Sequence, residues 1–134
     1  MDTCIFCKIV SGNLSCNRIY EDEKYLSFLD IFPRVAGHAL VIPKKHYRWV
    51  YDVPDFEEYW GVAKKVANKI QKSLDSEYIS FLTIGNEVLH AHIHILPQSS
   101  AKLKGIRFEE VVIFKDFEMK EILNKINEKN ETKK

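Results

Sequence analysis

The stretch LHAHIHILPQ, residues 89–98, places three histidines at alternate positions: His90, His92 and His94. Alternate side chains of a β-strand point to the same face of its sheet. The three imidazoles are therefore expected on one face, about 6.5–7 Å apart along the strand. The apolar residues between and after them are expected to face a core; these are Ala91, Ile93 and Ile95. This strand alone predicts a sheet with one buried face and one face rich in titratable groups.

Imidazole chemistry offers three explanations for the histidine strand, because the ring can be a base, an acid, a nucleophile or a metal ligand. The strand could be a polar, solvent-facing edge, although strict alternation in a chain with only five histidines argues against this. It could form a transition-metal site of the His-x-His-x-His type. It could also carry nucleophilic catalysis, with one imidazole attacking and the others positioning groups or donating protons.

The composition fits one ordinary domain. The chain has 134 residues, 46% of them apolar, and a formal net charge of +1. These values allow a substantial core and give no reason to expect a nucleic-acid or membrane partner. No apolar run has the length of a membrane-spanning helix, and the N-terminal MDTCIFCKIVSG lacks the basic and apolar regions of a secretory signal. We therefore expect a cytoplasmic protein.

Further elements are predicted outward from the histidines. Strands are expected at residues 17–21, 25–31, 38–42, 77–85 and 90–96. Pro97 is expected to end the last strand. A short N-terminal helix or turn is expected to close at Gly12, and a last helix to precede a charged tail. Strands in hairpin pairs with one inserted long helix predict an antiparallel α+β fold. One domain is expected over residues 1–127, with a frayed tail at 128–134.

The long helix is expected within PDFEEYWGVAKKVANKIQKSLD, residues 54–75. Pro54 suits the first helical position, and the acidic residues that follow it suit the positive end of the helix dipole. Spacings of three and four predict one buried stripe, which consists of Phe56, Trp60, Ala63, Ala67, Ile70 and Leu74. The lysines expected on the solvated face are Lys64, Lys65, Lys69 and Lys72.

Three cysteines are present: Cys4 and Cys7 form a C-x-x-C pair, and Cys16 stands apart. An odd number in a chain without a secretory signal argues against a disulfide framework. The pair could be half of a zinc site, a redox dithiol or an uninvolved pair. The redox alternative lacks the βαβ context that such motifs favour.

Several segments, taken in order, resemble the histidine triad (HIT) family. HAHIHIL resembles the family signature His-φ-His-φ-His-φ-φ, where φ is apolar. CIFCKIVSGN resembles the N-terminal segment of the family, and YEDEKYLSFLDIFPRVAGHALVIPKKHY resembles its central hairpin and strand. The similarity covers residues 3–98. It implies a HIT-like fold, with a five-stranded antiparallel sheet, one long helix, a short N-terminal helix and a C-terminal helix. Family members are small nucleotide-binding hydrolases and transferases that act at an α-phosphate.

The resemblance implies roles for four histidines. His92 would attack the α-phosphorus and form a covalent nucleotidyl-imidazole that water then hydrolyses. His94 would hydrogen-bond the phosphate or the leaving group. His90 and His38 would hold the geometry, with His38 packed behind the triad. A satisfied core histidine at the start of a strand is the plainer interpretation of His38, and both can be true.

The resemblance also implies a substrate-binding set for a purine nucleotide, of the phosphoramidate or dinucleoside polyphosphate type. Asp30 would accept the ribose hydroxyls. The apolar slot for the base would consist of Phe6, Ile9, Leu14 and Phe28, although core packing explains these four equally well. Many relatives carry Gly-Gln-Ser or Gly-Gln-Thr in a phosphate-binding loop. Here Gly85, Asn86 and Glu87 occupy that region; Asn86 can donate to a phosphate, whereas an ionised Glu87 would repel it.

A structural zinc ion is the cofactor that the resemblance implies. Some bacterial HIT proteins, and the related galactose-1-phosphate uridylyltransferases, have two cysteines, a later histidine and the first triad histidine as zinc ligands. The corresponding residues here are Cys4, Cys7, His46 and His90. The site would tie the N-terminal segment to the histidine strand.

Two further expectations concern assembly and turnover. The family is commonly dimeric with a continuous sheet, so a homodimer is expected. The aromatic cluster that follows His46 could cover the pocket or form a subunit interface; it consists of Tyr47, Trp49 and Tyr51. The alternative to an enzyme is a nucleotide-binding or scaffold protein that keeps the fold with little turnover.

Overall fold

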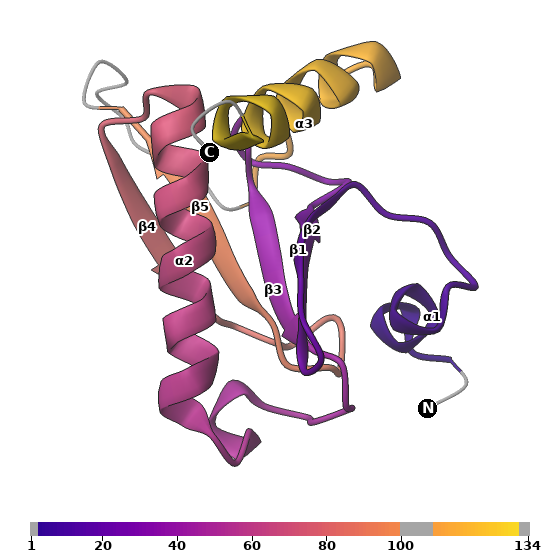
Figure 1. Cartoon of the computed structure of the whole chain (residues 1–134). Helices are drawn as coiled ribbons and strands as arrows, with labels where there is room; N and C mark the ends of the chain where they lie inside the picture. The colour runs from indigo at the N-terminus through magenta and orange to yellow at the C-terminus, as the bar shows by residue number, and fades with distance from the viewer. Residues whose placement is uncertain (1–2, 100–108, 132–134) are drawn as a thin grey trace.

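The computed structural model describes residues 3–99 and 109–131 of the chain. Five strands form one antiparallel sheet in the order β1-β2-β3-β5-β4, with α2 lying across one face (Figure 1). The strands are β1 (Arg18–Glu21), β2 (Tyr25–Leu29), β3 (Ala39–Pro43), β4 (Tyr78–Leu82) and β5 (Ile93–Gln98). The predicted α+β class and the five-stranded antiparallel sheet are confirmed.

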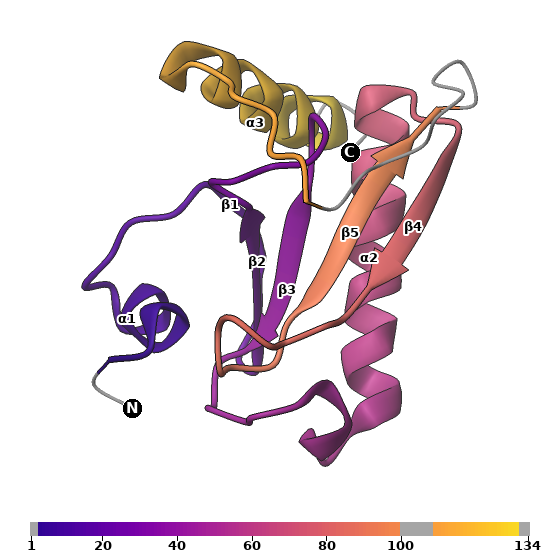
Figure 2. The same ribbon diagram turned by 180° about the vertical axis from the view of Figure 1, so that it is seen from behind.

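Two apolar clusters, one on each face of the sheet, divide the core. The larger joins α2 (Phe56–Leu74) to inward residues of the strands, among them Val41, Ile93 and Ile95. The smaller joins α1 (Ile5–Ser11) to β2 and β3 through Phe6 and Phe28. Figure 2 shows this second face, with the connection from β4 to β5 passing below β5 and β3 toward β2.

The N-terminal segment forms a helix, α1, that ends at Gly12 as the sequence predicts. Cys4 is its N-cap, and the Cys4 Sγ accepts a hydrogen bond from the Cys7 backbone N–H at 3.4 Å. Gly12 ends the helix with φ +88°, a left-handed conformation that glycine adopts without strain. This short helix thereby holds two cysteines close together at its start.

The turn between β2 and β3 places Asp30 and His38 side by side. β2 ends at Leu29, two residues before the predicted end, because the Asp30 Oδ1 accepts the Phe32 N–H at 2.8 Å and closes a local turn. The Asp30 N–H then donates to the His38 carbonyl at 2.9 Å. β3 consequently begins at Ala39 rather than at His38.

β5 differs from its prediction at both ends. It begins at Ile93, so His90 and His92 precede the regular ladder, and it continues through Pro97 to Gln98. The Gln98 carbonyl accepts a hydrogen bond from the Glu77 N–H on the β4 side. The nitrogen of the neighbouring Pro97, which has no hydrogen to donate, therefore faces away from β4. β5 pairs with β3 only over Ile93–Ile95, so no hydrogen bond is lost there. β4 is correspondingly shorter than the predicted 77–85.

The long helix α2 begins at Phe56, two residues later than predicted. Asp55 is its N-cap and accepts the Glu58 N–H at 3.0 Å, so Pro54 lies outside the helix. The buried stripe is also rotated: Phe56 is 44% exposed, and Trp60 and Leu74 are half-buried. The buried residues are Tyr59, Val62, Ala63, Val66, Ala67, Ile70 and Ser73.

The rotation of α2 follows from Tyr59. Its ring is fully buried, and its hydroxyl donates to the Val41 carbonyl at 2.7 Å, which satisfies the polar end of the side chain. Of the predicted solvated lysines, Lys69 is half-buried and donates to the Ile19 carbonyl at 2.7 Å. Lys64, Lys65 and Lys72 are exposed.

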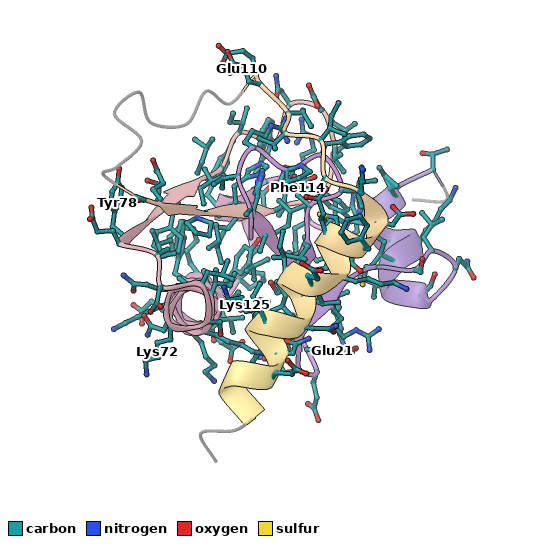
Figure 3. All side chains as sticks on the ribbon, turned by 90° about the horizontal axis from the view of Figure 1, so that it is seen from above. Glu21, Lys72, Tyr78, Glu110, Phe114 and Lys125 are labelled. Atoms are coloured by element: carbon teal, nitrogen blue, oxygen red, sulfur yellow. The ribbon has the colours of Figure 1, made fainter. Side chains whose placement is uncertain are left out.

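The last helix α3 (Asp116–Glu131) lies against α2 and β1 (Figure 3). Ile126 is fully buried, and its carbonyl accepts the Ser73 hydroxyl at 3.0 Å. The expected frayed tail at 128–134 therefore begins inside a helix, and residues 132–134 lie outside the described part. None of the helices described is both long and apolar enough to cross a membrane.

Candidate functional site

The three histidines of the opening motif lie on the α1 side of the sheet and are buried: His90 is 0%, His92 7% and His94 6% exposed. The rings of His92 and His94 are 5.0 Å apart between centroids. Phe6 of α1 contacts both His90 and His92 edge-on, at 5.8 and 5.2 Å. Ala91, Ile93 and Ile95 instead join the core under α2. The alternation of faces predicted from the sequence is confirmed.

The protonated nitrogen of His92 is decided by a backbone carbonyl. His92 Nδ1 lies 2.7 Å from the His90 carbonyl oxygen. A carbonyl can only accept, so Nδ1 carries the proton and a neutral ring keeps its lone pair on Nε2. Burial lowers the pKa of His92 below its ordinary value, and the charge of Arg48 acts in the same direction. His92 is therefore a neutral imidazole with a basic Nε2 at neutral pH.

His38 and His94 form a directed hydrogen-bond chain. The Arg34 N–H donates to His38 Nδ1 at 3.0 Å, so the proton of a neutral His38 lies on Nε2. His38 Nε2 is 2.8 Å from His94 Nδ1, which makes His94 the acceptor and leaves its own proton on Nε2. Burial lowers the pKa of each ring to about 3. The chain thus presents His94 as a neutral Nε2–H donor.

Asp30 follows β2, beside the hydrogen-bond chain of His38 and His94, and is 8% exposed. Its Oδ2 is 3.5 Å from His38 Nε2 and 3.6 Å from Arg34 Nη1. Burial raises the pKa of Asp30, while the Phe32 N–H and the Arg34 charge oppose that rise. Asp30, His38 and His94 also place ligand-type atoms within 4.8 Å of one another. The hydrogen bonds already described account for that closeness without a metal.

A second cluster joins Cys4, Cys7, His46 and His90, whose ligand atoms all lie within 4.8 Å of one another. Three sulfur–nitrogen distances are short: Cys4 to His90 is 3.4 Å, Cys7 to His46 is 3.3 Å and Cys7 to His90 is 3.5 Å. A tetrahedral zinc ion with ordinary Zn–S and Zn–N bonds sets such distances at about 3.5–3.6 Å. The four residues therefore fit a closed zinc site.

The chemistry of the donors agrees with this geometry. His90 Nε2 lies 2.8 Å from the Pro43 carbonyl, so Nε2 carries the proton and the Nδ1 lone pair faces the sulfurs. Burial lowers the pKa of His90 to about 4. Burial and the neighbouring Cys4 raise the pKa of Cys7 to about 11. A cation beside Cys7 would thus favour its thiolate form.

The predicted apolar slot is only partly assembled. Phe6 and Phe28 are buried together, with ring centroids 5.7 Å apart, and Ile9 packs against their cluster. Leu14 is 42% exposed and does not belong to that cluster, because the helix ends at Gly12 before reaching it. Val88, which was not selected from the sequence, packs there instead.

The turn before the histidines carries Asn86 and Glu87, which are both exposed. The charge of Glu87 is one of the influences that raise the pKa of Asp30, after burial of the Asp30 carboxyl. The turn is held by Arg48, whose Nη1 donates to the Gly85 carbonyl at 2.7 Å. Sequence reasoning missed Arg48, because its contact joins residues that are 37 positions apart.

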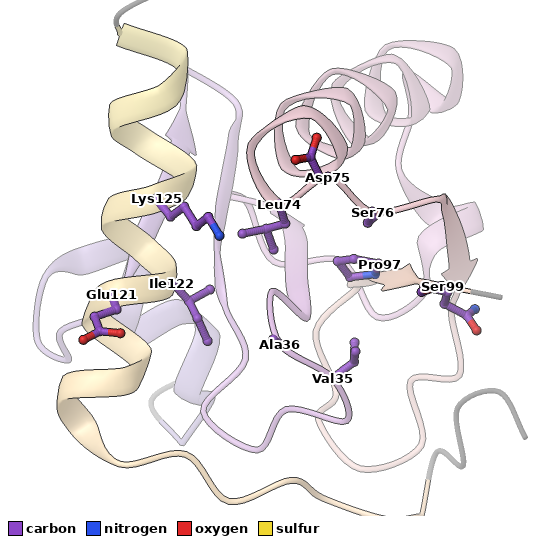
Figure 4. Close-up of a pocket in the computed structure, with 11 residues that line it drawn as sticks. Val35, Ala36, Leu74, Asp75, Ser76, Pro97, Ser99, Glu121, Ile122 and Lys125 are labelled. Carbon is purple, nitrogen blue, oxygen red and sulfur yellow. The ribbon is translucent and has the colours of Figure 1, made fainter. Parts of the chain in front are cut away.

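A cavity of about 390 Å³ lies elsewhere, between the end of α2, α3 and the end of β5 (Figure 4). Its lining includes apolar Leu74 and Ile122 and charged Asp75 and Lys125. None of the site residues predicted from the sequence lines this cavity. The predicted histidines and cysteines lie instead beside α1 and the histidine segment.

A family model described as the HIT domain matches residues 11–101. An uncharacterized HIT-like protein of Methanocaldococcus jannaschii is 38% identical over 130 residues, which cover 92% of this chain and 98% of that protein. The adenosine 5′-monophosphoramidase hnt1 of Schizosaccharomyces pombe is 36% identical over 101 residues, which cover 72% and 74%. The crystal structure of a zinc-bound histidine triad family protein from Mycobacterium smegmatis has a TM-score of 0.75 at 27% identity and covers 98% of both chains. The chain described here thus belongs to the histidine triad (HIT) family.

Proposed function

We propose that this protein is a nucleotide hydrolase or nucleotidyl transferase that reacts at the α-phosphate of a purine nucleotide through His92. The observation that carries the proposal is the contact of His92 Nδ1 with the His90 carbonyl, which leaves the lone pair on Nε2. A relative named as an adenosine 5′-monophosphoramidase supports nucleotide hydrolysis in general. The substrates proposed are adenosine phosphoramidates or dinucleoside polyphosphates.

The proposed reaction has two steps. His92 Nε2 attacks the α-phosphorus, a nitrogen–phosphorus bond forms, and the bond from phosphorus to the leaving group breaks. The His94 Nε2–H donates a hydrogen bond to an oxygen of the α-phosphate, the leaving group takes its proton from water, and His38 orients the His94 ring. Water then cleaves the nitrogen–phosphorus bond, which releases the nucleoside monophosphate and restores neutral His92.

The remaining site residues hold the nucleotide in this proposal. The Asp30 carboxylate accepts the ribose hydroxyls, since it is held at the site by the Phe32 N–H. Phe6, Phe28 and Ile9 line the slot for the base. Leu14 lies outside this cluster and is 42% exposed, so it contacts the base at the exposed rim of the slot. Asn86 is the proposed donor to the phosphate.

We also propose a structural zinc ion in the cluster of Cys4, Cys7, His46 and His90. The sulfur–nitrogen distances and the Nδ1 lone pair of His90 support it, as does a zinc-bound relative of the same fold. Zinc there would neutralise the two thiolates and connect α1 to the histidines. No step of the reaction passes through the metal.

A homodimer is proposed from the free side of β4. This strand is at the edge of the sheet, and Tyr78 and Phe81 on it are 44% and 42% exposed. Phe81 contacts Trp60 of α2, which contacts exposed Phe56. A contiguous aromatic surface beside an unpaired strand edge favours pairing with a second copy.

The test of the proposed function compares His92→Ala with the unchanged protein. We expect His92→Ala to bind adenosine monophosphate within about threefold of the original affinity, because the ring's neighbours remain, while turnover falls at least about a thousandfold. Steady-state kinetics and isothermal titration calorimetry measure the two effects. Equal turnover by both proteins would refute the role of His92. Binding without turnover by the unchanged protein would support a nucleotide-binding protein instead.

A further inference from the structure

Arg48 is a half-buried cation with no carboxylate at ion-pair distance among residues 3–99 and 109–131. Its side chain contacts two neutral groups. Nη1 donates to the Gly85 carbonyl at 2.7 Å, and the guanidinium carbon lies 3.6 Å from the centroid of the Trp49 ring. A guanidinium has five N–H donors, so donors remain for an oxyanion. A partly desolvated charge of this kind is stabilised by an anionic ligand.

The segment that carries Arg48 is fixed against the histidines at several points. The Ala91 N–H donates to the Tyr47 carbonyl at 2.7 Å. Gly85 has φ +71° and packs on Trp49, where an added Cβ would lie 3.3 Å from the ring. Trp49 is in turn stacked on Tyr51, with centroids 5.8 Å apart and planes at 6°. Arg48 is therefore held rigidly beside the turn that leads to His90.

Arg48 lies at the His90 end of the histidine segment. Its Nη1 contacts Gly85 in the turn that leads to His90, and the carbonyl of the neighbouring Tyr47 accepts the Ala91 N–H at 2.7 Å. Asp30, the proposed ribose acceptor, lies instead beside His38 at the other end of the histidine segment. A nucleotide with its ribose on Asp30 and its α-phosphorus at His92 therefore extends its leaving group away from Asp30, toward Arg48.

We infer that Arg48 binds phosphate oxygens of the leaving group and makes the site selective for phosphate-bearing leaving groups over amines. This inference rests on the proposed function, because it concerns the same site. It also explains how a phosphate is accepted next to Glu87, whose carboxylate repels it: the guanidinium supplies the compensating positive charge. Arg48 is thus a specificity-determining residue outside the three histidines.

The experiment compares Arg48→Gln and Arg48→Lys on two substrates, diadenosine tetraphosphate and adenosine 5′-phosphoramidate. Glutamine keeps an N–H donor for Gly85 but removes the charge. Lysine keeps the charge but lacks the planar set of N–H donors of a guanidinium. We expect Arg48→Gln to lower kcat/KM at least about tenfold for the polyphosphate and less than about threefold for the phosphoramidate. Arg48→Lys should retain more polyphosphate activity than Arg48→Gln. The control is Arg18→Gln, which removes an exposed ion pair with Glu21.

Equal losses on both substrates, or no loss on the polyphosphate, would overturn the inference. If the unchanged protein turns over neither substrate, the proposed function fails, and calorimetry with ADP and AMP still tests Arg48. ADP should then bind several times more tightly than AMP, and Arg48→Gln should abolish the difference. An absent difference, or one that survives Arg48→Gln, would refute the role of Arg48.

Discussion

Backbone carbonyls decide the proton positions on two of the site histidines. The Pro43 carbonyl takes the Nε2–H of His90, and the His90 carbonyl takes the Nδ1–H of His92. The two rings consequently present opposite nitrogens, Nδ1 toward the sulfurs and Nε2 toward a substrate. The sequence predicts which residues are histidines and which face they share. It does not predict these tautomers, because the carbonyls that decide them come from the folded backbone.

The burial of His38 predicts a stability that depends on pH. Asp30, Arg34 and His94 face its ring, and burial lowers its pKa to about 3. The unfolded chain therefore binds more protons below pH 6.5, and stability falls as the pH drops from 6.5 toward 3. His38 contributes up to about 1.4 kcal/mol per pH unit to this slope.

Urea unfolding between pH 5 and pH 7 measures this contribution. His38→Asn keeps an acceptor for the Arg34 N–H and removes the titrating group. We expect its free energy of unfolding to fall less steeply below pH 6.5 than that of the unchanged protein, by about 1 kcal/mol per unit. The difference between the two slopes cancels the titration of all other groups. Identical slopes would show that His38 is protonated equally in both states.

Two residues mark the limit of sequence reasoning at this scale. Leu14 was expected in the base slot; it follows the end of α1 at Gly12 and is 42% exposed, so its contact with a base stays a prediction. Arg48 was not selected, although its neighbours in PKKH were, because its partner Gly85 is distant in the chain. Local motifs predict residues within one element, whereas contacts between elements appear only in the fold.

At the scale of the elements, the edge strand β4 predicts a dimer. Phe81 on β4 is 42% exposed, and a lysine there would place a charge in an apolar contact. We expect the unchanged protein to be a dimer and Phe81→Lys to be a monomer by size-exclusion chromatography with light scattering. The control is Phe117→Lys on α3, where the side chain is 58% exposed and far from β4 in sequence. A monomeric unchanged protein, or a dimeric Phe81→Lys variant, would contradict this surface.

The elements were predicted well in type and less well in extent. The five predicted strands and the predicted helices α1, α2 and α3 are present, because alternation and helical spacing are local signals. The end of β5 was wrong, since Pro97 is tolerated where β3 no longer pairs. The buried stripe of α2 was wrong at Phe56, because the rotation of a helix on a sheet depends on partners such as Val41.

At the scale of the whole molecule, the cysteines bring the N-terminal segment close to the histidine segment. α1 carries Cys4 and Cys7 close to His46 and His90, and the His90 carbonyl holds the His92 ring. A zinc ion in this cluster would thus stabilise the fold and the proposed nucleophile together. Zinc at several hundred times its Kd would contribute about 3–4 kcal/mol.

Removing the thiols tests this connection. Cys4→Ser and Cys7→Ser together should abolish bound zinc, measured by elemental mass spectrometry, and lower the Tm. Serine at position 4 keeps an oxygen able to cap α1, so the loss reports the metal rather than the helix. Cys16→Ser, outside the cluster, should keep both zinc and Tm. Zinc and full stability in the double variant would refute the site.

The most direct test of the account is intact-protein mass spectrometry after rapid mixing with adenosine 5′-phosphoramidate and acid-free quenching. We predict a species heavier by one adenylyl group in the unchanged protein, located on His92 by peptide mapping and absent from His92→Ala. The same species in His92→Ala, or rapid product formation without any adduct on the unchanged protein, would contradict a covalent nucleotidyl-histidine.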